Sequence, residues 1–228
     1  MPILNGVKPW VTLDQAELPD GSKLTLRSHD GEFVIAADGY DLMVSRMHGS
    51  EEALASLALG EGRKKKRVLV GGLGMGYTLR AALDLLPHDG EVVVAELLQQ
   101  VVDWNRDVLA DLAGRPLEDR RTTVDVRDVR DVIRLSPPNR YDVILLDVDN
   151  GPDSWTQNSN GWLYTGNGLA AIARALKVRG MLAIWAVRTD PSFERRLGAA
   201  GFHAETKKVK ARGVHGGPMQ AVFLGKLR

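Results

Sequence analysis

From Arg67 onwards, short apolar runs alternate with stretches of helical pattern, and this alternation limits the fold more than any other feature. Parallel strands need long crossover connections, which are usually helices, so the pattern predicts a mainly parallel sheet covered on both faces. The last two strands follow each other without a helix between them, so the seventh is expected to run antiparallel. The expected strands are residues 68–70, 91–95, 122–126, 141–146, 181–187, 203–209 and 219–224, and the expected helices are 77–86, 99–112, 128–135, 168–176 and 193–200.

The first part of the chain has a different pattern. Four short runs rich in β-branched and aromatic residues (10–18, 23–28, 32–37 and 40–45) are separated by three turn sequences, all of which contain Asp-Gly, a strong signal for a hairpin. A helix over residues 49–59 follows, with Ser50 as the expected N-cap and two glutamates in its first turn. We therefore predict a small β-hairpin domain with its linking helix over residues 1–60, and a nucleotide-binding catalytic domain over residues 61–228.

Composition excludes several classes of function. The formal net charge is +1, so no overall field attracts nucleic acid or an anionic membrane. The chain has no cysteine, which excludes disulfides, thiolate zinc sites and a cysteine nucleophile, and its histidines show no metal-ligand spacing. No apolar stretch approaches the ~18 residues of a membrane span, and no signal peptide is evident. We expect a cytoplasmic enzyme that uses a small molecule and no metal; a homodimer is left open.

A glycine-rich loop lies between the first strand and the first helix of the alternating region. Glycines let the backbone turn sharply and approach a ligand closely, while the following helix offers free N–H groups at its start. A carboxylate, Glu96, ends the second strand about 20 residues later, where it can accept hydrogen bonds from both ribose hydroxyls. Asp128 follows the third strand, where it can accept from an adenine amino group. The candidate loop residues are Gly71, Gly72, Gly74 and Gly76.

Dinucleotide dehydrogenases and methyltransferases share such an arrangement, and three features favour the second class. The loop does not fit Gly-x-Gly-x-x-Gly from Gly72, because Tyr77 occupies the place of the last glycine. A third acidic position exists at Asp128, and the chain ends in a hairpin and not in a further crossover. The sequence therefore predicts a site for S-adenosylmethionine or a related adenosyl nucleotide.

From about Asp38 to Leu176 the chain resembles the spermidine synthase family, polyamine aminopropyltransferases built on the S-adenosylmethionine-dependent methyltransferase fold. Residues 71–74 stand where that family has Gly-Gly-Gly-Asp. By the same resemblance Glu96 is the ribose-binding glutamate and Asp128 binds the adenine amine. The start of helix 49–59 resembles the family's segment that ends in Gln-Glu at the start of the corresponding helix. This resemblance implies that Glu51 lies near the nucleotide. The resemblance implies a Rossmann-like α/β fold: a seven-stranded sheet with its last strand antiparallel, and a small N-terminal hairpin domain.

The end of the fourth strand carries the candidate catalytic residues. Residues 147–152 (Asp-Val-Asp-Asn-Gly-Pro) resemble the family's Asp-Ser-Ser-Asp-Pro-x-Gly-Pro, and residues 163–165 resemble a following Leu-Phe/Tyr-Thr/Ser. The family's catalytic base is the second aspartate of that motif, a position that Asn150 occupies here. Asp147 is expected nearer the nucleotide, and Asp149 either replaces the base or caps a turn. Tyr164 completes the candidate set, and residues 155–162, with two tryptophans, are expected to form a lid.

Amine attack on a sulfonium carbon needs a free nitrogen lone pair, and a carboxylate can take the proton from an ammonium of pKa ~10. Because Asn150 replaces the expected base, the first hypothesis is methyl transfer from S-adenosylmethionine to a small amine-bearing acceptor. The second is aminopropyl transfer from decarboxylated S-adenosylmethionine, as in polyamine biosynthesis. The third is a non-catalytic nucleotide-binding relative.

Overall fold

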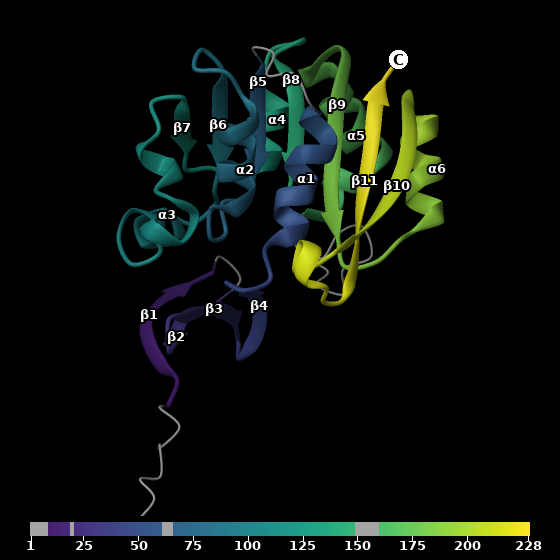
Figure 1. The fold of residues 1–228 in the computed structure, drawn as a ribbon. Coiled ribbons are helices and arrows are strands. Elements are labelled where there is room, and N and C mark those ends of the chain that lie inside the picture. The colour runs from purple at the N-terminus through teal and green to yellow at the C-terminus, as the bar shows by residue number, and fades with distance from the viewer. Residues whose placement is uncertain (1–8, 19–20, 61–65, 149–159) are drawn as a thin grey trace, which may run out of the picture. The chain divides into compact units, whose positions relative to one another are not determined.

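The computed structural model describes residues 9–18, 21–60, 66–148 and 160–228, and the chain forms two compact units (Figure 1). The first unit extends to Met47 and the second runs from His48 to Arg228. The sequence analysis grouped helix α1 (Gly49–Leu59) with the hairpins, but it belongs to the second unit. It packs mainly against helix α2 (Tyr77–Leu85) and strand β9 (Leu176–Ala186) of that unit. The division therefore differs from the predicted boundary at residue 60.

The first unit contains one antiparallel sheet in the order β1-β2-β3-β4. Two-residue loops join its last three strands, and in both loops the Asp and the Gly have positive φ, as a type I′ turn requires. The Asp-Gly signals therefore set these hairpins. The strands are β1 (Val11–Glu17), β2 (Lys23–His29), β3 (Glu32–Ala37) and β4 (Tyr40–Val44).

The second unit is built on a seven-stranded sheet in the order β10-β11-β9-β8-β5-β6-β7, in which only β11 runs antiparallel to its neighbours. The predicted fold class is confirmed, including the separate N-terminal sheet. The strands are β5 (Arg67–Gly71), β6 (Glu91–Ala95), β7 (Thr122–Asp125), β8 (Tyr141–Leu146), β9 (Leu176–Ala186), β10 (Phe202–Lys210) and β11 (Met219–Leu227).

Helices cover both faces of this sheet, with α1 and α2 on one face and α4 and α5 on the other (Figure 1). The helices are α2 (Tyr77–Leu85), α3 (Gln99–Arg106), α4 (Val129–Leu135), α5 (Gly166–Ala175) and α6 (Pro191–Ala199). The short 3-10 helices are η1 (Ala110–Ala113), η2 (Pro116–Glu118), η3 (Asn160–Tyr164) and η4 (Gly213–His215). None of the helices in the described part of the chain is long and apolar enough to cross a membrane.

The start of α1 differs from its prediction. The N-cap residue is His48 and the helix begins at Gly49, so Ser50 lies inside the first turn and does not cap it. Its hydroxyl donates to the carboxylate of Glu51. A glycine is needed at position 49, because a Cβ there would lie 2.2 Å from the backbone nitrogen of Gly213 in η4. The loop between β10 and β11 is thus held against the start of α1, where Gly49 also donates to the carbonyl of Ala211.

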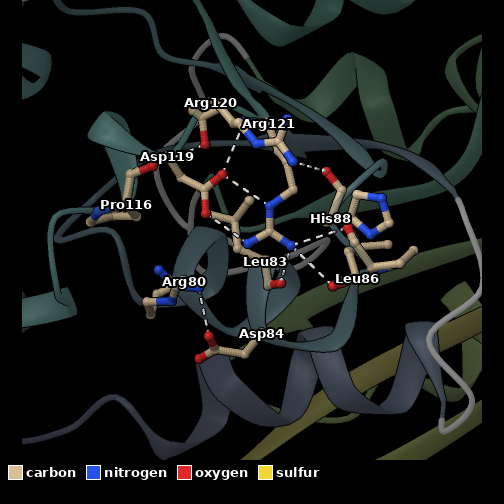
Figure 2. A network of polar contacts seen from close by, with 11 residues as sticks. Arg80, Leu83, Asp84, Leu86, His88, Pro116, Asp119, Arg120 and Arg121 are labelled. Atoms are coloured by element: carbon tan, nitrogen blue, oxygen red, sulfur yellow. Dashed lines mark hydrogen bonds and ion pairs between the residues drawn. The ribbon is translucent and has the colours of Figure 1, made fainter.

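Arg121, just before β7, fastens the far end of α2 to the sheet (Figure 2). Its Nη1 donates to the carbonyls of Leu83, Leu86 and Pro87 at distances of 2.8, 3.0 and 3.2 Å. These oxygens lie at the C-terminal end of α2, where carbonyls lack partners within the helix and where a cation is favoured. Nε and Nη2 donate to the carboxylate of Asp119 at 2.9 and 2.6 Å.

The Asp119–Arg121 pair is expected to make stability depend on pH. Hydrogen bonding to Arg121 lowers the pKa of Asp119 to about 2, although burial opposes the shift. Because the folded pKa lies below the unfolded value, the stabilisation is complete above pH ~4 and is lost as the pH falls towards 2. Asp119→Asn should therefore lower the free energy of unfolding by about 2 kcal/mol at pH 7, and by less at pH 3. Urea unfolding at both pH values measures this.

Asp111→Asn provides a matched control for that measurement. Asp111 pairs with Arg115 on an exposed surface, where such pairs contribute little, so its replacement should change stability by less than ~0.5 kcal/mol at either pH. An equal loss for Asp119→Asn at pH 7 and pH 3 would contradict the assignment of the low pKa.

Candidate functional site

The glycine loop crosses the carboxyl edge of the sheet at the point where the strand order reverses, since β5 lies between β6 and the later strand β8. Open α/β sheets bind ligands at such a point. Three loop glycines have positive φ: Gly72 (87°), Gly74 (52°) and Gly76 (84°). At Gly72 an added Cβ would lie 2.2 Å from the carbonyl oxygen of Asp147. The loop backbone therefore touches the end of β8, and only glycine fits there.

Glu96 follows β6 on the other side of the loop. Its side chain is buried, with the residue 8% exposed, and its two oxygens accept from the backbone N–H groups of Leu73 (2.9 Å) and Leu98 (3.0 Å). Burial raises the pKa of Glu96, and the N–H donors oppose that rise. The backbone N–H groups of Leu97 and Gly74 also favour its ionised form, so the carboxylate is held at the edge as an acceptor, and its contact with ribose hydroxyls stays a prediction.

Asn105 also holds the loop, and the sequence analysis missed it. Its amide nitrogen donates to the carbonyl of Gly74 at 2.8 Å and to that of Val101 at 2.9 Å, and the residue is 2% exposed. A polar residue among Val101, Val102 and Trp104 on the apolar face of the predicted helix was the available signal. A buried amide needs partners, and here one of them is the loop.

Asp128 lies after β7 and is the N-cap of α4. Its Oδ1 accepts from the backbone N–H of Arg130 at 2.8 Å, and the guanidinium of Arg130 donates to both carboxylate oxygens. Burial favours a higher pKa, but the hydrogen bonds from Arg130 outweigh it and lower the pKa of Asp128. The carboxylate is thus fixed and ionised at the β7 side of the edge, and its contact with an adenine stays a prediction.

Asp147 and Glu51 form an acidic pair at the β8 side of the loop. Asp147 Oδ2 accepts from the hydroxyl of Thr78 at 2.7 Å, on the first turn of α2. Glu51 is buried, at 6% exposure, in the first turn of α1, which packs against α2 and β8. Burial raises the pKa of Glu51 to about 8, with a further contribution from the charge of Asp147. Burial also raises the pKa of Asp147 to about 6, which the Thr78 hydroxyl opposes.

No cation neutralises this pair within the described ranges. Neither Glu51 nor Asp147 forms an ion pair with a lysine or arginine there. Asp147 accepts from the hydroxyl of Thr78, and Glu51 accepts from the hydroxyl of Ser50 and from its own backbone N–H. Buried charges in proteins are normally paired. Glu51 is buried and Asp147 is half-buried, so this pair, which no described cation neutralises, is suited to a cationic ligand.

Two rings lie beside the pair. His48 stacks on Tyr77 with ring centroids 4.3 Å apart, and its Nδ1 lies 2.8 Å from a carboxylate oxygen of Glu52. Burial, together with Glu51 and Glu52, raises the pKa of Tyr77 to about 12, so its hydroxyl stays protonated at neutral pH. The structure adds these rings and Thr78 to a region where the sequence indicated only Glu51 and Asp147.

The other candidate catalytic residues are not gathered at this edge by the described structure. Tyr164 is 6% exposed and packs edge-on against Phe193 in the core, with centroids 5.7 Å apart; its catalytic role stays a prediction. Asp149 and Asn150 lie outside the described residues, as do residues 155–159 of the expected lid. Of that lid segment, Trp162 is described, and the guanidinium of Arg134 lies over its ring at 4.9 Å.

The comparisons with known proteins give one family match and several solved structures of similar fold. A family model described as the spermine/spermidine synthase domain matches residues 47–197. The chain is similar to the crystal structure of spermidine synthase from Thermotoga maritima, with a TM-score of 0.73 and 20% identity over 94% of this chain and 72% of that one. The chain is also similar to a spermidine synthase in complex with the transition-state analogue AdoDATO. The TM-score is 0.72, with 20% identity over 94% of this chain and 72% of that one.

A probable spermidine synthase from Corynebacterium glutamicum is also similar, with a TM-score of 0.66 and 17% identity over 95% of this chain and 79% of that one. These structures share the Rossmann-like methyltransferase fold with the chain. A comparison with curated proteins finds no match.

Proposed function

The chain belongs to the spermine/spermidine synthase family, and on that premise we propose that it transfers an aminopropyl group from decarboxylated S-adenosylmethionine to a small amine such as putrescine. This reverses the order of our two transfer hypotheses. Asn150 led us to place methyl transfer first, but the family match supports a spermidine synthase-like transferase better. The methyl-transfer hypothesis has no support from the comparisons.

The observation that carries the proposal is the pair of Glu51 and Asp147, for which the described part of the chain supplies no counter-ion. The tail of S-adenosylmethionine ends in an ammonium and a carboxylate, whereas the decarboxylated donor has the ammonium alone. A carboxylate placed beside buried Glu51 and half-buried Asp147 is repelled, and an ammonium there is attracted. The β8 side of the edge therefore favours the donor that has lost its carboxylate.

The order of the strands supports one orientation of the donor. Glu96 at the end of β6 is the proposed partner of the ribose hydroxyls, and Asp128 beyond β7 the proposed partner of the adenine amine. The sulfonium and the aminopropyl tail then lie towards β8, above Gly72 and close to Asp147. The family resemblance assigns the same roles to Glu96 and Asp128.

The reaction is a displacement at carbon. The nitrogen of the acceptor attacks the methylene carbon bonded to sulfur; a C–N bond forms, the C–S bond breaks, and sulfur keeps the electron pair as the neutral thioether methylthioadenosine. Sulfonium and amine are both cationic when they bind, so two carboxyl groups lower the cost of bringing them together. Holding nitrogen, carbon and sulfur in line supplies much of the remaining rate.

The experiment is a donor panel with two readouts. Calorimetry should show that decarboxylated S-adenosylmethionine binds at least ~10-fold more tightly than S-adenosylmethionine, a difference of ~1.4 kcal/mol. Mass spectrometry of putrescine incubated with each donor should show the gain of one aminopropyl group, and Asp147→Asn should narrow the discrimination between donors. Tighter binding of S-adenosylmethionine, or a methylated product, would overturn the proposal.

A further inference from the structure

We propose that Glu51 is the catalytic residue that takes the proton from the attacking amine, an inference that rests on the proposed function. An aliphatic amine with a pKa of ~10 reaches the site as an ammonium and has no lone pair until a base removes a proton. A base must therefore stand on the side of the edge where the amine, the methylene carbon and sulfur meet.

The four carboxylates that the structure describes at this edge fall into two groups by position. Glu96 and Asp128 accept from backbone N–H groups and lie at the ends of β6 and β7, on the side proposed for the nucleoside. Asp147 follows β8, and Glu51 lies on the first turn of α1, which packs against α2 and β8; this is the side to which the aminopropyl tail is directed. Among the carboxylates that the structure describes, these two are therefore the candidates for the proton acceptor.

The surroundings of the pair assign different roles to its members. Asp147 is fixed by the hydroxyl of Thr78, which stabilises its ionised form. Glu51 has the greater affinity for a proton, because it is buried on the first turn of α1 and faces the negative charge of Asp147. Asp147 therefore remains the anion that attracts the cations, and Glu51 is the group that accepts a proton near neutral pH.

The groups around Glu51 make its titration interpretable. The charge of Asp147 on β8 and that of Glu52 on α1 both raise the pKa of Glu51. The hydroxyl of Tyr77 on α2 stays protonated at neutral pH. His48, the N-cap of α1, has its Nδ1 2.8 Å from a carboxylate oxygen of Glu52. Arg212 precedes η4, which contacts α1, and is exposed. With a pKa of about 8 and burial as the main cause, the free enzyme gains ionised Glu51 as the pH rises through 8.

The proton balance of the step is complete without another reactant. Ionised Glu51 takes a proton from R–NH3⁺ and becomes a neutral carboxylic acid, and R–NH2 attacks the methylene carbon. The C–N bond forms as the C–S bond breaks, giving methylthioadenosine and a secondary ammonium. Glu51 then releases its proton to solvent. Entry of two cationic substrates favours the ionised form of Glu51 before the step.

The test is Glu51→Gln, which keeps the size of the side chain and removes its basicity, with Glu52→Gln as a matched control on the same turn. With decarboxylated S-adenosylmethionine and putrescine, single-turnover rates of Glu51→Gln should fall by about 10²–10⁴, the usual contribution of a general base. Its donor Kd should stay within ~fivefold of wild type, since Asp147 remains. Glu52→Gln keeps the base, so above pH 8 its rate should stay within ~threefold of wild type; the pKa of Glu51 should be somewhat lower, because the charge of Glu52 contributes to its rise.

The pH profile gives the second readout. In the wild type, log(kcat/KM) should rise with pH along a limb that levels off above pH ~8. Glu51→Gln should lose that limb, while Glu51→Asp should keep it at a lower rate. Retention of the limb or of the rate by Glu51→Gln overturns the inference, as does a fall in rate that matches the loss of donor binding. Absence of aminopropyl product from the wild type overturns the proposed function instead.

Discussion

Glu96→Ala is expected to abolish binding of the adenosyl nucleotide while the protein stays folded. The variant loses two hydrogen bonds from ribose hydroxyls to a charged acceptor, each contributing ~1.5–3 kcal/mol, which corresponds to a ~10²–10⁴-fold higher Kd. It also removes the acceptor for the backbone N–H of Leu73, so the glycine loop loses its attachment to the end of β6. Calorimetry with methylthioadenosine measures the effect.

The control for this variant is Glu91→Ala, at the opposite end of the same strand. Glu91 is half-exposed and pairs with Arg67, away from the carboxyl edge, so its replacement should leave the Kd unchanged. A Kd of Glu96→Ala within twofold of wild type, with circular dichroism unchanged, would remove Glu96 from the nucleotide site.

Gly72→Ala is expected to abolish nucleotide binding and to destabilise the second unit by more than ~3 kcal/mol. An alanine at a φ of 87° is strained by ~1–2 kcal/mol, and its Cβ would lie 2.2 Å from the carbonyl oxygen of Asp147, so the backbone must move as well. Denaturant unfolding and calorimetry measure the two effects.

Gly201→Ala separates strain from collision. Gly201 has a φ of 97°, but nothing lies within 4 Å of the added Cβ. Its replacement should therefore cost only the ~1–2 kcal/mol of strain and leave binding intact. Equal losses of stability for the two variants would show that the close contact between the loop and β8 contributes nothing.

The elements that the sequence predicted best are those whose signal is local. The Asp-Gly turns at residues 30–31 and 38–39 and the strand–glycine–helix pattern of residues 67–85 each carry their own conformational requirement, and the structure confirms them. Helix α3 shows the opposite case. Its periodicity predicted a helix to residue 112, but it ends at Arg106, because Asp107 leaves helical geometry with a ψ of −101° and η1 follows. No proline or glycine marks that end.

The site divides in the same way. Glu96 and Asp147 were predictable because parallel strands bring their carboxyl ends to one edge, so position in the chain implies position in space. Thr78 and Asn105 were not, since their importance depends on partners 69 and 31 residues away. That none of the described residues places a cation beside Glu51 is also a property of packing between α1, α2 and β8, which no local pattern in the sequence encodes.

The position of β11 has a consequence for synthesis on the ribosome. This strand is made last of the seven, yet it lies between β9 and β10 and is the partner of both. Strands β5 to β9 can pair as they emerge, but β10 has no neighbour until β11 arrives. At ~5–20 residues per second, β9 keeps an open edge for a few seconds while the chain from its end to residue 227 is made. An open edge is a template for pairing with other chains, so this interval is when the nascent protein most needs a chaperone.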